Sequence, residues 1–259
     1  MTWPVVARWD VDVLREDRSF LLFPLFFALL AAAIGYAFTR GSGGPPLSTG
    51  LALLCLFAVP LTAATVTHEA VPAAVASGRV RLALSLPHTR SGFLSGTGAA
   101  RLAVTLAGVA AAVVTGGAVF AVRGGALAPL ETAAVVALAV LLAAAFVAGT
   151  LALTAGSAST TLAAAAAYAF FAVAFFWPVV VNAAAVLART TLDVAVGGAA
   201  IDAAIAASPI YAYGTALAGV GVDVASVAAV PAWTGVLVLS AWTALGYAAA
   251  VARFDRLEL

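Results

Sequence analysis

Between Glu131 and Arg189 the chain runs for 57 residues without a charged side chain. A helix needs roughly 20 apolar residues to cross the hydrocarbon core of a bilayer, and its backbone polar groups must be satisfied within the segment. The rest of the sequence has the same character, since only 9% of its 259 residues are charged and 64% are hydrophobic. Soluble domains carry about 25% charged residues. We therefore expect an all-α integral membrane protein that lies almost wholly in the bilayer.

The uncharged windows predict six transmembrane helices. The window 132–188 is too long for one helix and divides naturally at TAGSASTT, residues 154–161. Residues 203–222 are also uncharged, but Ser208, Pro209 and three glycines make them a poor seventh span. In chain order, the spans are expected near residues 19–39, 48–67, 101–122, 132–153, 161–181 and 231–252.

The distribution of arginines favours six spans with both termini in the cytoplasm. With the N-terminus inside, nine arginines fall in cytoplasmic segments, and only Arg40, Arg123 and Arg189 fall in external ones. An excess of basic residues on the cytoplasmic side is the usual pattern of membrane proteins. The nine are Arg8, Arg15, Arg18, Arg79, Arg81, Arg90, Arg101, Arg253 and Arg256. A multi-pass protein of the plasma membrane is the expected result.

Two segments outside the spans are expected to lie at the membrane surface. Residues 3–18 place Val6, Trp9 and Val13, with Phe20 beyond them, at roughly helical spacing, which predicts an amphipathic interfacial helix; a solvated tail is the alternative. Residues 183–222 are external and still apolar. Because long loops without structure of their own are uncommon, we expect short helices there at, or dipping into, the outer membrane face, with a poorly ordered loop as the alternative.

The sequence offers no catalytic or metal site. His68–Glu69 lacks the second histidine of a zinc-binding HExxH helix, and His88 lies twenty residues away. Cys55 is the single cysteine, so neither a disulfide within the chain nor a metal cluster is expected. A chain without lysine cannot contain the phosphate-binding GxxxxGK[ST] loop. We expect no cofactor, no hydrolysis of ATP by this chain and, at a net charge of +1, no nucleic-acid partner.

The spans also lack the ionisable groups that ion-coupled carriers place within the membrane. Energy for any transport would therefore have to come from a partner. The hinge of residues 68–100, between spans two and three, is the candidate contact. Gly78 is predicted to end a short helix there, because glycine tolerates positive φ. Pro87 suits the first turn of a second helix that runs on into span three.

Glu69 lies where the second span meets the cytoplasm. Arg79, Arg81 and Arg90 follow in this hinge and are expected to give it a positively charged surface. The simpler alternative is that these arginines only fix the topology. The order of HEA and then SGRVRLALSLPHTR after span two resembles the ABC-2 type transporter permeases, as does SPIYAYG at residues 208–214. The likeness is greatest to the branch that contains the permease of nitrous-oxide-reductase maturation. Where the family has a glycine-lysine pair this chain has SGTGAAR, so Arg101 is the candidate for that positive charge.

The resemblance implies a permease subunit of an exporter that pairs with a second permease chain, either an identical copy or a related one. Two ABC ATPase subunits would bind the ATP and dock beneath the pair, and a path lined mainly by spans one, two and five would open to the outer face. The implied ATPase-coupling surface consists of Glu69, Gly78, Arg79, Arg81, Pro87 and Arg90. The alternative is a structural or assembly membrane protein that recruits a cytoplasmic partner without transport. The substrate stays open, although an uncharged lining suits a hydrophobic or amphipathic one.

Overall fold

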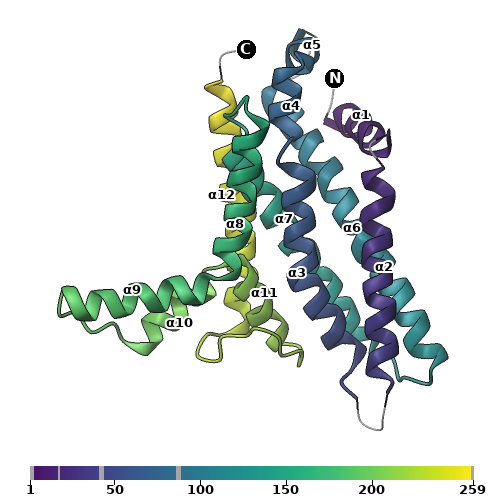
Figure 1. Ribbon diagram of the computed structural model, residues 1–259, viewed down its shortest axis with the longest axis vertical. Helices are drawn as coiled ribbons and strands as arrows, with labels where there is room; N and C mark the ends of the chain where they lie inside the picture. Colours follow the sequence, from purple (N-terminus) through teal and green to yellow (C-terminus); the bar gives the residue numbers. More distant parts are fainter. Residues whose placement is uncertain (1–2, 17, 41–43, 86–88, 258–259) are drawn as a thin grey trace.

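The computed structural model describes residues 3–16, 18–40, 44–85 and 89–257. Within these residues the chain forms twelve α-helices and no strand. Five helices are long and apolar enough to cross a membrane, and a bent pair supplies a further candidate. The long helices lie side by side in an elongated bundle (Figure 1). The prediction of an all-α membrane protein is confirmed at this level.

The five long helices correspond to predicted spans. Of these, α3 and α7 bury most of their surface inside the bundle, whereas α2 and α12 bury little and form its margins. The bundle helix α6 begins eleven residues before the predicted start of span three, because the helix of the hinge continues into the span without a break. Their bounds are α2 Ser19–Phe38, α3 Leu47–Thr67, α6 Arg90–Val122, α7 Pro129–Thr154 and α12 Ala232–Asp255.

Glycines allow the bundle helices to approach closely. A Cβ atom added to Gly35 of α2 would lie 2.7 Å from the carbonyl oxygen of Gly116 on α6. One added to Gly246 of α12 would lie 2.9 Å from the backbone of Ala148 on α7. Small residues at such crossings are a common means of packing helices in a membrane, where the hydrophobic effect does not drive association between helices. These contacts make α2 with α6, and α12 with α7, closely packed pairs.

The predicted fifth span is corrected by the structure. Helix α8 (Thr160–Phe175) ends six residues before the predicted boundary at 181, and α9 (Trp177–Thr191) continues at an angle of 70° to it. The cause is Pro178, which has no N–H to donate to the carbonyl of Ala174 four residues earlier. Ser208 Oγ donates to that carbonyl instead, at 2.8 Å. Tyr211 Oη donates to the next one, of Phe175, at 3.3 Å.

Short helices occupy the segment after this bend, as predicted for residues 183–222. Helices α9 and α10 (Gly198–Ala206) project sideways from the bundle in Figure 1, and Trp177 Nε1 ties them together by donating to the carbonyl of Ala204 at 2.7 Å. Helix α11 (Pro209–Ala218) instead packs against α3, α7 and α12, and its Tyr213 is completely buried. The segment therefore combines an exposed arm with a helix that belongs to the core.

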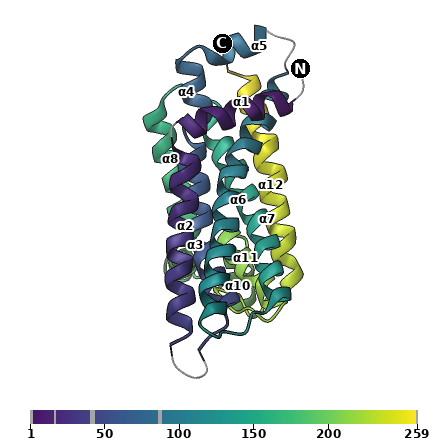
Figure 2. The same cartoon turned by 90° about the vertical axis from the view of Figure 1, so that its right-hand side faces the viewer.

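Helix α1 (Trp3–Glu16) crosses one end of the bundle, near α4 and α5 (Figure 2). The predicted helix is present, but its buried stripe differs from the expected one. Val6 and Leu14 are buried as apolar residues, and Asp10 lies between them on the same face. Trp9, expected on that face, is 43% exposed. The face toward α6 thus contains a carboxylate, and its partner is described below.

Candidate functional site

The hinge after α3 consists of two short helices joined by a tight turn. Helix α4 (Ala70–Ala76) ends at Ser77, and α5 (Arg79–Ser85) follows Gly78 directly. Gly78 has φ +73° and donates its N–H to the carbonyl of Val75 at 3.0 Å, as predicted for a helix-ending glycine. No heavy atom lies within 4 Å of the position that a Cβ would take. The backbone conformation, rather than lack of space, therefore favours glycine here.

The two arginines after this turn have different surroundings. Arg79 donates from Nε to Ser77 Oγ at 3.1 Å, and its guanidinium carbon lies 5.9 Å from the centre of the Trp9 ring on α1. Arg81 is exposed, and the neighbouring Leu82 is 71% exposed. Arg79 thus connects the hinge to α1, whereas Arg81 and Leu82 face outward. Val80, between the arginines, is fully buried and fixes α5 to the bundle.

Glu69 lies between α3 and α4, with 63% of its side chain exposed. Its Oε1 is 3.4 Å from His68 Nε2. Across the described residues, no three His, Cys, Asp or Glu side chains come together in a way that would hold a metal ion. Pro87 and His88 lie outside the described residues.

Arg90 points away from the hinge surface and toward the end of α12. Its Nη1 donates to the carbonyl oxygens of Phe254, Asp255 and Leu257 at 2.6, 3.1 and 3.1 Å. The last carbonyls of a helix lack partners within the helix, so a cation at this position satisfies them and also opposes the negative end of the helix dipole. Arg90 therefore holds the first turn of α6 against the C-terminus of α12.

A buried ion pair fixes α1 to α6. Arg101 Nη2 lies 2.9 Å from Asp10 Oδ1, and both side chains are about nine-tenths buried. Burial raises the pKa of the Asp10 carboxyl, and the positive charges of Arg101 and Arg79 oppose that effect. Asp10 was not among the residues predicted from the sequence to be functional. Its spacing could have indicated burial: Asp10 lies four residues from both Val6 and Leu14, on the apolar face of a helix whose other face is charged.

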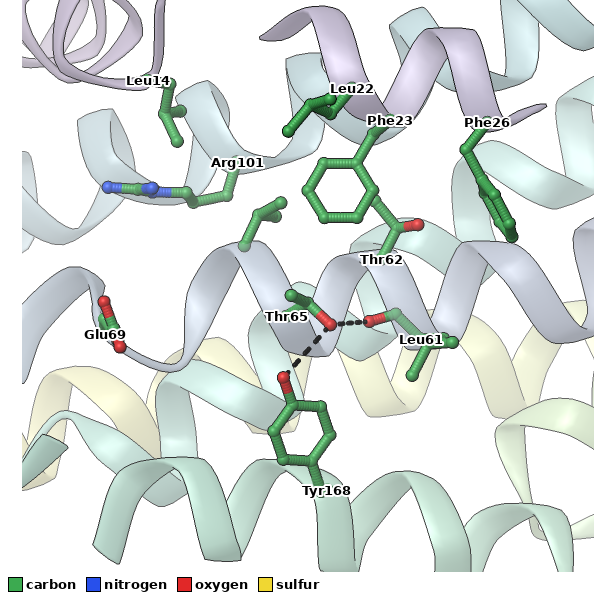
Figure 3. Close-up of a pocket in the computed structure, with 11 residues that line it drawn as sticks. Leu14, Leu22, Phe23, Phe26, Leu61, Thr62, Thr65, Glu69, Arg101 and Tyr168 are labelled. Atoms are coloured by element: carbon green, nitrogen blue, oxygen red, sulfur yellow. Dashed lines mark hydrogen bonds between the residues drawn. The ribbon is translucent and has the colours of Figure 1, made fainter. Parts of the chain in front are cut away.

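A cleft of about 590 Å³ opens between α2, α3 and α8, beside this ion pair (Figure 3). Tyr168 of α8 donates from its hydroxyl to Thr65 Oγ1 of α3 at 3.4 Å across it. Figure 3 places Glu69 and Arg101 toward one end of the cleft and Phe26 toward the other. The cleft therefore has a polar end and an apolar end. Its apolar lining includes Leu14, Leu22, Phe23, Phe26, Leu61 and Val66, and its polar lining is Thr62, Thr65, Glu69, Arg101 and Tyr168.

This arrangement agrees with the comparison to known families. The sequence model described as "ABC-2 family transporter protein" matches residues 5–259, nearly the whole chain. The chain belongs to the ABC-2 transporter family. No individual curated protein matches it, so the family assignment comes from this match. As an ABC-2 family protein it is a multi-pass membrane permease subunit of an ABC transporter. The likeness to the nitrous-oxide-reductase branch stays a prediction.

In this ABC-2 permease the predicted site residues divide into two groups. Glu69, Gly78, Arg79 and Arg81 belong to the hinge that α4 and α5 form, at the end of the bundle that α1 crosses. Arg90 lies at the same end, but its guanidinium is engaged by α12. The structure thus leaves the α4–α5 hinge, with α1 beside it, as the coupling candidate.

Proposed function

We propose that this permease exports a hydrophobic or amphipathic substrate across the plasma membrane, using ATP hydrolysed by a separate ABC ATPase. The chain would cross the membrane six times, with α8 and part of α9 as a broken fifth span, and would pair with an identical or related permease. Both termini would be cytoplasmic. The arginines support this orientation, because nine belong to the end that carries α1, α5 and the last turn of α12.

The end of the bundle formed by α1, α4 and α5, which we call the coupling surface, is the proposed ATPase contact. The observation that carries the proposal is the α4–Gly78–α5 turn, which projects beyond the end of α3 (Figure 1). Arg81 and Leu82 on α5 are both exposed. A short helix with one exposed cation and one exposed leucine suits a groove with an apolar floor and an acidic rim. Arg79 and its contact with Trp9 would transmit a displacement of α5 to α1.

The cleft between α2, α3 and α8 is the proposed start of the substrate path. These helices are spans one, two and five, the spans that the family resemblance implies for the path. Its apolar walls, its polar end with Glu69 and Arg101, and the hydroxyls of Thr65 and Tyr168 between the two ends suit a molecule that has an apolar body and a polar group. An amphipathic substrate entering from the inner half of the membrane fits this arrangement best.

The first test identifies the partner. The tagged chain is purified from its native membranes, and co-purifying proteins that contain a phosphate-binding loop are identified by mass spectrometry. The expected ATPase hydrolyses ATP faster when reconstituted with the chain than alone. Recovery of a cytoplasmic protein that is not an ATPase would instead support the assembly function, and the transport proposal would then be wrong.

The second test is Arg81→Glu, with Arg189→Glu on the exposed arm as the matched control, since both arginines are exposed. Leu22 lines the cleft and is replaced by cysteine to report on it; the native Cys55 is buried and should react little with a maleimide. We expect ATP to change the labelling rate of Leu22→Cys in the parent and in Arg189→Glu. Arg81→Glu should abolish that change while inserting normally. Equal responses in both variants would contradict the proposed coupling role.

A further inference from the structure

A second cavity system lies between α7 and α12, with Phe170 of α8 also in its lining. Its inner part is an apolar groove of about 520 Å³ with almost no polar atom on its surface. Trp242 and Gly246 of α12 form one wall, and Gly149 and Leu153 of α7 form the other. The Trp242 ring is fixed by an N–H bond to the carbonyl of Ala207 at 2.9 Å. This bond holds the Trp242 ring in place at the wall of the groove.

A smaller cavity of about 380 Å³ continues the groove toward the end of the bundle that carries α1. Leu153 lines both cavities, so the two share a wall. Arg253, in the last turn of α12, and Arg256, just after the helix, line this cavity together with Ser157. The described residues that line this cavity include no carboxylate. The apolar groove therefore leads to a smaller cavity lined by the side chains of Arg253 and Arg256.

The length of the groove matches one half of a bilayer. From Trp242 to Arg253 the α12 axis rises about 16 Å, at 1.5 Å per residue, and one leaflet of the hydrocarbon core is about 15 Å thick. An acyl chain lying between Trp242 and Leu153 would bring its headgroup to the level of the arginines. Arg253 donates Nη1 to the carbonyl of Ala152 at 2.7 Å, which holds its guanidinium against α7. Its other N–H groups suit a phosphate oxygen, which guanidinium groups often bind in a bidentate way.

We propose that the α7–α12 groove binds one anionic phospholipid of the leaflet on the α1 side. Its acyl chain occupies the apolar part, and its phosphate is held by Arg253 and Arg256. This site is distinct from the cleft lined by α2, α3 and α8, and it does not depend on the ATPase. It gives these two arginines a specific ligand in addition to their contribution to topology. Basic pockets between helices at the cytoplasmic side of a membrane commonly bind such headgroups.

The test uses the full chain, delipidated in detergent, with native mass spectrometry as the readout. Dioleoyl phosphatidylglycerol and dioleoyl phosphatidylcholine have the same acyl chains and differ in net charge. We expect the wild type to bind the first about tenfold more tightly or better. Arg256→Gln should weaken that binding about fivefold, and the double variant with Arg253→Gln about thirtyfold. Arg189→Gln, an exposed arginine at the other end of the bundle, should leave it unchanged.

A second pair of variants tests the apolar part. Ala249 lines the groove, so Ala249→Phe should fill it and abolish binding of both lipids, whereas Ala248→Phe on the neighbouring, exposed position should not. The Arg256→Gln variant keeps the Arg253–Ala152 bond, so it tests the headgroup contact even where the double variant unfolds. Equal binding of the two lipids, unchanged binding in Arg256→Gln or in Ala249→Phe, or full competition by soluble glycerol phosphate would each overturn the proposal.

Discussion

Arg101 and Asp10 are 91 residues apart in the chain, yet Arg101 Nη2 donates to Asp10 Oδ1 at 2.9 Å inside the contact between α1 and α6. The pair is buried on a largely apolar face, where Val6 approaches Gly96 and Leu14 packs with Ala100 and Val104. This ion pair fixes α1 to the bundle, whereas an interfacial helix without such a contact would be held only by the membrane surface.

Removing one member of this pair should destabilise the protein strongly. Asp10→Ala leaves Arg101 buried without its counter-charge, which costs about 3 kcal/mol or more and should lower the unfolding midpoint by roughly 6 °C or more in detergent. Asp12→Ala is the control, because Asp12 pairs with Arg15 at 3.6 Å on the exposed side, where such pairs contribute about 0–1 kcal/mol. Similar small shifts in both variants would show that the buried pair does not hold α1.

Gly78 and Gly124 provide a matched test of coupling. Both have positive φ, +73° and +83°, and open space around the Cβ position, but they lie at opposite ends of the bundle. Substitution by alanine should cost about 1 kcal/mol of stability at either site, because an L-residue is strained there. Only Gly78→Ala should also weaken the ATP-dependent change in labelling of Leu22→Cys. An equal effect of Gly124→Ala on labelling would mean that lost stability, not the hinge, is responsible.

Ser208 should stabilise the bend between α8 and α9. Ser208→Ala leaves the buried carbonyl of Ala174 without a donor, at a cost of about 1–3 kcal/mol. Ser240→Ala on the exposed side of α12 removes only a bond to its own helix, at Val236, and should be nearly neutral. Thermal unfolding of the two variants in the same detergent measures the difference. A neutral Ser208→Ala would indicate that the bend depends on Pro178 alone.

Arg90 should behave as a structural residue. Arg90→Gln removes the cation from the last carbonyls of α12, which should lower the unfolding midpoint by several degrees, since hydrogen bonds from a charged group contribute about 1.5–3 kcal/mol. Arg81→Gln, at an exposed site, should leave the midpoint unchanged. Limited proteolysis near Arg256 should be faster in Arg90→Gln, because the carbonyls at the end of α12 lose their hydrogen bonds to α6. Unchanged unfolding midpoints in both variants would contradict this structural role, and Arg90 would again be a candidate for contact with the ATPase.

Hydropathy was sufficient to predict most of the bundle, because a charge-free run of about 20 residues has few alternatives to a spanning helix. It failed at the fifth span, since the average apolarity of residues 161–181 carries no information about helix direction. Pro178 was the visible signal, but the serine that completes the bend lies 30 residues further on. Gly78 was predictable because its role is local. Arg90 and Asp10 were not, because the partners of both come from distant helices.

The length of α6 has a mechanical consequence. Its 33 residues span about 50 Å, whereas the hydrocarbon core is about 30 Å thick, so a rigid rod extends well past the membrane on at least one side. Asp10 is fastened to this rod at Arg101, and Gly116 locks it against α2 near the far end. A push on α1 would therefore act through a lever arm. A tilt of α6 about a point inside the bilayer would carry α2 with it, because the two helices pack closely at Gly35 and Gly116.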